Sequence, residues 1–240
     1  MSYIYSIEMI KQLEKIFEGQ EEEMEKAISE VFRTIKEDRI IHTFGSGHSH
    51  MVGLELFIRA GGLGNVNAML DQDVLTSNGA LRSSKLEKLE GLADIIWEEY
   101  KIEKGDIIII ISNSGRNALP VEMALRAKKE RIKIIAITSL TQTREFASRH
   151  SSGKKLFETA DIILDNKVIS GDGIMKIGND RVGAMSSING MFIINTVVAE
   201  AMIRAEKAGI ELPVYSSQNI DSFENNDKLY KKYRGRVKLI

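Results

Sequence analysis

A run of five isoleucines at residues 107–111 constrains the fold of this chain more than any other feature of its sequence. Neighbouring side chains of a strand point to opposite faces of a sheet, so an unbroken apolar run fits a strand that is buried on both faces. A helical pattern follows at 118–130, and between the two lies a polar turn, Ser112-Asn113-Ser114-Gly115-Arg116-Asn117. We therefore predict a buried central strand that carries a polar turn at its carboxyl end.

The same alternation of short apolar strands and helices extends to both sides of this run. The pattern predicts further strands at 39–44, 65–70, 133–138 and 160–165, and helices at 50–60, 85–100, 118–130 and 142–148. Such alternation is typical of a parallel sheet that is covered on both faces. We predict an α/β fold with a doubly wound, five-stranded parallel sheet in the order 2-1-3-4-5.

The remaining segments are predicted to complete one domain over residues 1–240. Apolar residues at helical spacing indicate an N-terminal helical segment within 1–37. The α/β core, with a closing helix at about 184–207, is expected over 38–210, and a polar tail over 211–240. Residues 167–183 are rich in glycine and aspartate and are predicted to be irregular.

Composition excludes several classes of protein. The 33 basic and 34 acidic residues leave a net charge of −1, which argues against a nucleic-acid partner. The absence of cysteine excludes disulfides and thiolate metal sites. No basic segment followed by an apolar run opens the chain, and no uninterrupted apolar stretch reaches about 18 residues, the length a membrane span needs. We expect a cytoplasmic protein with no membrane partner.

Two predicted strand-to-helix turns carry the same chemistry. The first reads Gly45-Ser46-Gly47-His48-Ser49, and the second is the turn at 112–117. Helix N-termini offer unpaired N–H groups and a partial positive charge, glycine lets the backbone approach an anion, and serine adds a donor. In the predicted sheet order the two turns are neighbours at the switch point, where ligands bind. Both turns are therefore interpreted as parts of one phosphate site.

Other interpretations of these turns remain open. The serines and asparagines can act only as helix caps, with glycine making the turn. A dinucleotide site is a weaker alternative, because the third glycine of that motif is missing although Asp71 lies near the distance for a ribose contact. A Walker loop is excluded, since the chain contains no Gly-Lys-Ser or Gly-Lys-Thr.

The segments "TFGSGHSHMVGLELFIRAGG", "IIIISNSGRNALPVEMALRA" and "IIAITSL" resemble the sugar isomerase (SIS) domain. With "RHSSGKKLFETADIILDN" and "NNDKLYKKYRGRV", the likeness extends to a phosphoheptose-isomerase-like branch and covers nearly the whole chain. The resemblance implies a flavodoxin-like fold and a homodimer or homotetramer with sites near the subunit interface. Together, the turns and the resemblance predict phosphosugar binding by Ser46, Gly47, Ser49, Ser112, Asn113, Ser114, Gly115, Asn117, Thr138 and Ser139.

The chain departs from the heptose isomerases at two places. The helix around Glu55 lacks the histidine and adjacent glutamates that those enzymes have there, and the last long helix carries no histidine for their acid–base pair. We therefore expect a sugar-phosphate isomerase of unspecified substrate that uses a carboxylate base. A phosphosugar sensor without catalysis and a phosphosugar lyase or etherase on the same domain are the alternatives.

Four residues are candidates for the proton transfers that an aldose–ketose isomerisation requires. Glu55 has apolar neighbours and follows the first turn, although it can instead pair with Arg59. Glu90 belongs to a helix that could cover the site. Glu200 lies in the apolar closing helix, where Arg204 could neutralise it. His48 stands in the first turn, and because the pair His48 and His50 has no further ligand at matching spacing, we expect neither a metal nor a cofactor.

Overall fold

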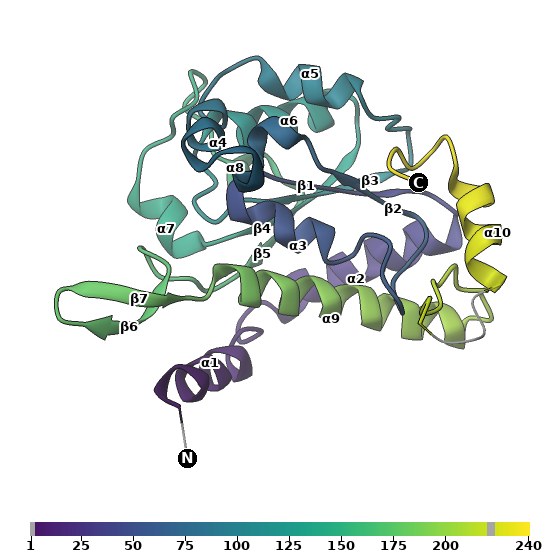
Figure 1. The fold of residues 1–240 in the computed structure, drawn as a ribbon, viewed down its shortest axis with the longest axis horizontal. Coiled ribbons are helices and arrows are strands. Elements are labelled where there is room, and N and C mark those ends of the chain that lie inside the picture. The colour runs from purple at the N-terminus through teal and green to yellow at the C-terminus, as the bar shows by residue number, and fades with distance from the viewer. Residues whose placement is uncertain (1–2, 220–223) are drawn as a thin grey trace.

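The computed structural model describes residues 3–219 and 224–240, and its centre is a five-stranded parallel sheet (Figure 1). The strand order is β2-β1-β3-β4-β5, which confirms the predicted doubly wound α/β fold. Residues 1–2 and 220–223, at the start of the predicted N-terminal segment and inside the predicted tail, lie outside the described residues. The strands are β1 (Ile41–Gly45), β2 (Val66–Met69), β3 (Ile107–Ile111), β4 (Lys133–Thr138) and β5 (Ile162–Asp165).

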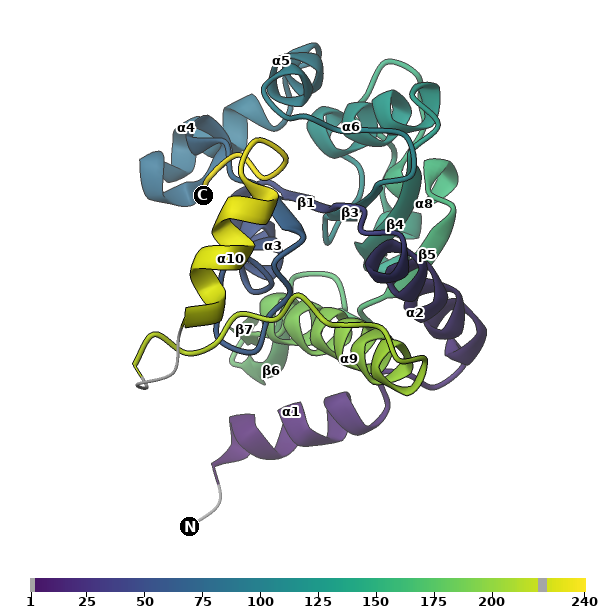
Figure 2. The ribbon, with the colours of Figure 1, turned by 90° about the vertical axis from the view of Figure 1, so that its right-hand side faces the viewer.

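The isoleucine strand β3 is buried on both faces, as its sequence predicts. Ile107, Ile109 and Ile111 belong to a core cluster with α2 (Glu21–Lys36) and α9 (Ser186–Lys207). Ile108 and Ile110 pack on the other face of the sheet, against α5 (Leu92–Glu98) and α6 (Ala118–Lys129). Figure 2 shows these helices in two layers with the sheet between them. Each fully buried isoleucine contributes about 1.5–3 kcal/mol of burial free energy.

Several helices and turns differ from the predicted bounds. The helix predicted at 85–100 is two helices, α4 (Ala80–Leu86) and α5, separated at Gly91, whose positive φ of 92° interrupts the helical path. The helix predicted at 50–60 ends early, as α3 (His50–Leu54). Residues 167–183, predicted to be irregular, contain most of an antiparallel hairpin, β6 (Gly173–Ile177) and β7 (Asp180–Ala184). The remaining short elements are η1 (Gly47–Ser49), η2 (Gln72–Val74), η3 (Thr76–Asn78), α7 (Leu140–Glu145) and α8 (Leu156–Thr159).

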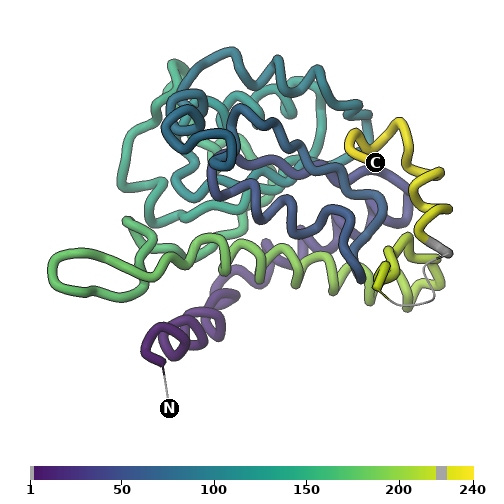
Figure 3. Tube along the Cα trace, in the orientation of Figure 1, coloured from purple at the N-terminus to yellow at the C-terminus, as the bar shows by residue number. Residues whose placement is uncertain are grey.

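The closing helix α9 is long and apolar enough to cross a membrane by length and composition. It nevertheless packs lengthwise on α2, and Ile193, Ile194 and Val197 enter the core from it. Its opposite side exposes apolar residues, among them Ile203, which is 46% exposed. The helix α1 (Ile4–Glu14) and the β6–β7 hairpin extend away from the sheet domain, as the chain trace shows (Figure 3).

The tail covers the amino edge of the sheet, opposite the turns. Helix α10 (Glu224–Tyr233) buries Tyr233 completely, in a cluster with Ile40 and Val237. The Tyr233 hydroxyl donates a hydrogen bond to Asp38 Oδ1 at 2.9 Å. The predicted polar tail therefore contributes a second, smaller core, and this leaves the carboxyl edge of the sheet for the candidate site.

Candidate functional site

The two polar turns lie side by side at the carboxyl edge of the sheet. Strands β1 and β3 are paired neighbours, and their last residues, Gly45 and Ile111, are register partners. The chain then enters η1 and α3 after β1, and α6 after β3. Gly47 and Gly115 have positive φ values of 56° and 58°, which glycine adopts without strain. The expected juxtaposition of the turns is therefore present.

One carboxylate, which the sequence analysis did not select, joins the two turns. Ser46 Oγ in the first turn donates a hydrogen bond to Glu87 Oε2 at 3.0 Å, and Asn117 Nδ2 in the second donates to Glu87 Oε1 at 2.8 Å. Glu87 directly follows α4. It therefore belongs to a third segment, the part of the chain that connects β2 to β3 and crosses the carboxyl edge of the sheet. Its main-chain oxygen also accepts from the Leu119 N–H at 3.1 Å. The side chain of Glu87 is thus bonded to both turns, and its backbone is bonded to the start of α6.

The environment of Glu87 changes its acidity. Burial raises the pKa of the half-buried carboxyl above its ordinary value of 4.5. The hydrogen bond from Ser46 and the positive charges of Lys88 and Arg149 oppose this rise without cancelling it. Among the carboxyl groups that the structure describes, Glu87 is the one hydrogen-bonded to both turns, and its pKa is raised.

The predicted binding residues of the two turns and of the end of β4 divide into two groups. Thr138 and Ser139 are fully buried: the Thr138 hydroxyl donates to the Asn113 carbonyl at 3.3 Å, and Ser139 Oγ accepts from the Gln142 N–H at 2.9 Å as the cap of α7. Ser112 Oγ accepts from the Gly115 N–H at 3.2 Å. These hydroxyls stabilise the shape of the turn.

Other groups in the turns are available to a ligand. Ser49 and Ser114 are half-buried, and their hydroxyls have no hydrogen-bond partner among the residues that the structure describes. Asn117, at the N-cap position of α6, makes no capping bond with its side chain and contacts Glu87 and Arg149 instead. The interpretation of Asn117 as a helix cap therefore fails.

Two arginines add positive charge next to the second turn. Arg149 Nη1 donates to Asn117 Oδ1 at 2.9 Å, and the Arg149 N–H donates to the Arg116 carbonyl at 2.8 Å. The Arg116 guanidinium lies 5.2 Å from the centre of the Phe146 ring, and its Nε is buried without a partner. Burial and the charge of Arg149 lower the pKa of Arg116. Within the described ranges, 3–219 and 224–240, neither guanidinium forms an ion pair with a carboxylate.

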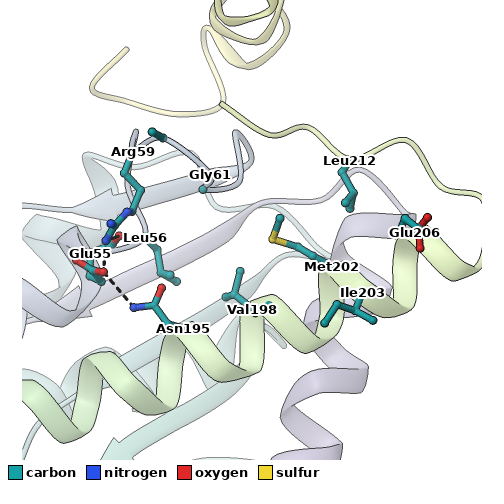
Figure 4. A pocket seen from close by; sticks show the side chains of 13 residues that line it. Glu55, Leu56, Arg59, Gly61, Asn195, Val198, Met202, Ile203, Glu206 and Leu212 are labelled. Atoms are coloured by element: carbon teal, nitrogen blue, oxygen red, sulfur yellow. Dashed lines mark hydrogen bonds and ion pairs between the residues drawn. The ribbon is translucent and has the colours of Figure 1, made fainter. Parts of the chain in front are cut away.

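Glu55, a predicted base, faces a different part of the molecule. Its carboxylate pairs with Arg59 and accepts a hydrogen bond from Asn195 Nδ2 of α9 at 3.0 Å. These residues line one end of a groove of about 650 Å³ between the segment that follows α3 and α9 (Figure 4). Apolar side chains such as Val198 and Met202 form its wall, and no residue of either turn lines it. Glu55, which we predicted as a base because it follows the first turn, instead forms the alternative pair with Arg59, and its side chain contacts α9.

The other three predicted catalytic residues make no hydrogen bond to Glu87 within the described residues. His48 is exposed in the first turn, and Glu200 is exposed on α9. Arg204, the expected neighbour of Glu200, pairs with Glu25 at 2.8 Å. Glu90 is exposed and accepts hydrogen bonds from Ser151, at 2.6 Å from its N–H and 2.7 Å from its hydroxyl.

Glu90 belongs to a cluster with Glu122 and His150 whose potential ligand atoms lie within 4.8 Å of one another. His150 Nδ1 accepts a hydrogen bond from the Ser152 N–H at 3.2 Å. His150 Nε2 lies 3.6 Å from Glu122 and 3.9 Å from Glu90, so the cluster connects the loop at 146–155 to α6 and to the segment before α5.

A family model described as "SIS domain" matches residues 4–139. The chain is 38% identical over 241 residues to UPF0309 protein TTE0306 of Caldanaerobacter subterraneus subsp. tengcongensis, with 98% of both chains covered. It is also 38% identical over 224 residues to UPF0309 protein BH3325 of Halalkalibacterium halodurans, covering 92% of this chain and 93% of that one.

Two solved structures share the fold at low sequence identity. Phosphoheptose isomerase GmhA from Neisseria gonorrhoeae matches with a TM-score of 0.51 and 17% identity, over 82% of this chain and 93% of that one. The Vibrio vulnificus NanR protein complexed with ManNAc-6P matches with a TM-score of 0.55 and 14% identity, over 99% of this chain and 69% of that one.

Proposed function

Because this chain belongs to the SIS domain family, we propose that it binds a phosphorylated sugar at the two turns that follow β1 and β3 and isomerises it between aldose and ketose forms. The observation that carries the proposal is the convergence of both turns at one edge of the sheet, beside two arginines that pair with no carboxylate of the described residues. The names of the two structural neighbours, a phosphoheptose isomerase and a ManNAc-6P complex, are consistent with a phosphosugar ligand.

The chemistry of the second turn suits a phosphate. Helix α6 begins at Ala118, and the partial positive charge at its start favours an anion, although the Leu119 N–H is already bonded to the Glu87 carbonyl and Pro120 has no N–H. The Ser114 hydroxyl is free to donate, and Arg116 and Arg149 supply positive charge. The Ser49 hydroxyl in the first turn is free to contact the same ligand. In this proposal the phosphate lies at the second turn and the sugar extends toward the first.

Replacing Ser114 with alanine should weaken binding of a sugar phosphate about tenfold, since one hydrogen bond to a charged group contributes about 1.5 kcal/mol. We would measure thermal shifts with fructose 6-phosphate, ManNAc 6-phosphate and arabinose 5-phosphate, and then titrate the best ligand by calorimetry. Ligand at one hundred times its Kd should stabilise the wild type by about 2.7 kcal/mol. Ser29→Ala, on α2, is the matched control and should bind as the wild type does. Equal affinities of the two variants would contradict the placement of the phosphate.

We also propose that the chain forms a homo-oligomer through the exposed apolar side of α9. Ile203 lies on this side, next to the groove of Figure 4. Light scattering should give a mass that is a multiple of 26.9 kDa, and Ile203→Glu should reduce it, because a buried charge without a partner is costly. Ile95→Glu, at a 64% exposed position on α5, is the control and should leave the mass unchanged. A single-chain mass for the wild type would refute this part of the proposal.

A further inference from the structure

We propose that Glu87 is the catalytic carboxylate that transfers the proton during isomerisation, a role that rests on the proposed function. Among the described carboxyl groups, only Glu87 accepts hydrogen bonds from both turns, from Ser46 at 3.0 Å and from Asn117 at 2.8 Å. A sugar whose phosphate lies at the second turn and whose chain extends to the first must pass this carboxylate. The Glu55 carboxylate accepts a hydrogen bond from Asn195, and the Glu90 carboxylate accepts one from Ser151. Glu200 is exposed on α9.

Glu87 is held in place from several directions. Its main-chain oxygen accepts from Leu119 in the first turn of α6, so the carboxylate moves with the helix that follows the second turn. The helix before it is anchored by Ser83, which is buried and donates through its hydroxyl to the Val74 carbonyl at 2.7 Å. A proton-transfer group needs such preorganisation, because a displacement of about 1 Å can lower a rate about a hundredfold.

The acidity of Glu87 suits a general base. A base is most effective when its pKa lies near the working pH, and burial moves the pKa of Glu87 upward in that direction. The hydrogen bond from Ser46 and the charges of Lys88 and Arg149 oppose this rise. Each carboxylate oxygen has two lone pairs, so the bonds to Ser46 and Asn117 leave others free for the substrate proton.

The proposed step balances without an oxidant or a metal. The Glu87 carboxylate takes the proton from the carbon next to the substrate carbonyl. The C–H electron pair becomes the double bond of an enediol, and the carbonyl oxygen takes a proton from a solvent water as its π pair moves onto it. Glu87 then returns its proton to the former carbonyl carbon, while the neighbouring hydroxyl gives its proton to the hydroxide left by that water and becomes the new carbonyl. Carboxylate and protein end unchanged.

Glu87→Gln tests this role, because it keeps the shape of the side chain and removes the base. The wild type would be incubated in deuterated water with fructose 6-phosphate, sedoheptulose 7-phosphate, ManNAc 6-phosphate and arabinose 5-phosphate, and exchange of the carbon-bound proton followed by NMR. On the sugar that exchanges fastest, Glu87→Gln should lower kcat about 100- to 10,000-fold, the range for lost acid–base catalysis. Its Kd for the same sugar should change less than about threefold, since both side chains accept from Asn117.

Three further variants separate catalysis from structure. Glu55→Gln and Glu90→Gln are matched controls and should keep kcat within about threefold of the wild type, because neither carboxylate touches the turns. Glu87→Asp keeps the charge and should retain measurable exchange with a changed pH profile. In the wild type, kcat should fall as pH falls through the raised pKa of Glu87.

The outcomes separate this proposal from the proposed function. Exchange that persists in folded Glu87→Gln, or that disappears in Glu55→Gln instead, overturns the role of Glu87 and leaves phosphosugar binding intact. Binding without any exchange by the wild type identifies a sensor, and it also overturns the catalytic role. If none of the sugar phosphates binds to the wild type, the proposed function fails and the role of Glu87 fails with it.

Discussion

Replacing Asp106 with alanine should lower the free energy of unfolding by about 3–5 kcal/mol, the usual result of removing one partner from a buried charged network. Asp106 is 3% exposed, at the amino end of β3. Its Oδ1 accepts from the Ile40 N–H at 2.9 Å, and its Oδ2 accepts from the Glu103 N–H at 2.8 Å and contacts His42 Nε2 at 3.2 Å. Alanine leaves all three of these groups without their acceptor, and His42 is fully buried.

Urea unfolding monitored by circular dichroism would measure this loss. Asp94→Ala is the matched control: Asp94 is an exposed carboxylate that pairs with Arg126 at 2.7 Å, and such pairs contribute at most about 1 kcal/mol. Equal stabilities of the two variants would show that the buried network is not a major source of stability.

The contribution of Asp106 should also depend on pH. Burial alone would raise the pKa of Asp106, but hydrogen bonds from His42 and from the N–H groups of Ile40 and Glu103 outweigh burial and lower it below its ordinary value of 3.8. A carboxyl with a lowered folded-state pKa stabilises the protein above its unfolded pKa, and this contribution is lost as pH falls through the folded value. The stability difference between wild type and Asp106→Ala should therefore be constant between about pH 5 and 7 and shrink below about pH 4.

The architecture was predictable because few arrangements satisfy the isoleucine strand. An apolar run without alternation requires cover on both faces, and the helices that follow each strand provide it. The order β2-β1-β3-β4-β5 then places the turns after β1 and β3 together. The packing of the polar tail could not be predicted. Tyr233 is fully buried there by tertiary contacts that no local sequence pattern indicates.

The sequence also could not predict which glutamate side chain lies at the candidate site. Glu87 and Glu90 are three residues apart in the segment predicted as one helix at 85–100, and each follows a leucine, so their neighbours do not distinguish them. Helix α4 ends at Leu86, so Glu87, directly after it, contacts the turns, whereas Glu90, next to Gly91 with its positive φ, contacts the loop at 146–155. Which glutamate reaches the site is decided by where a helix breaks, and helix bounds are the least certain property of a sequence-based prediction.

Replacing Gly115 with valine should abolish measurable phosphosugar binding and lower the free energy of unfolding by about 2–5 kcal/mol. Gly115 has a φ of 58°, a conformation that costs an L-residue about 1–2 kcal/mol. A Cβ at this position would also lie 3.0 Å from Thr138 Oγ1 and 3.3 Å from Thr143 Oγ1, both on buried residues, and such overpacking costs about 1–3 kcal/mol.

The loss of binding follows from the place of Gly115 in the second turn. The turn can relieve the contacts with Thr138 and Thr143 only by moving away from them, and Ser114 and the start of α6 then move too. Losing two hydrogen bonds to a charged phosphate, at about 1.5 kcal/mol each, weakens binding more than a hundredfold. Gly19→Val is the matched control, since Gly19 has a φ of 71° and open space around its Cβ position. Gly19→Val should lose only the ~1–2 kcal/mol of stability that the positive φ costs an L-residue, and should bind the sugar phosphate normally. Normal binding by folded Gly115→Val would show that the phosphate does not lie at the second turn.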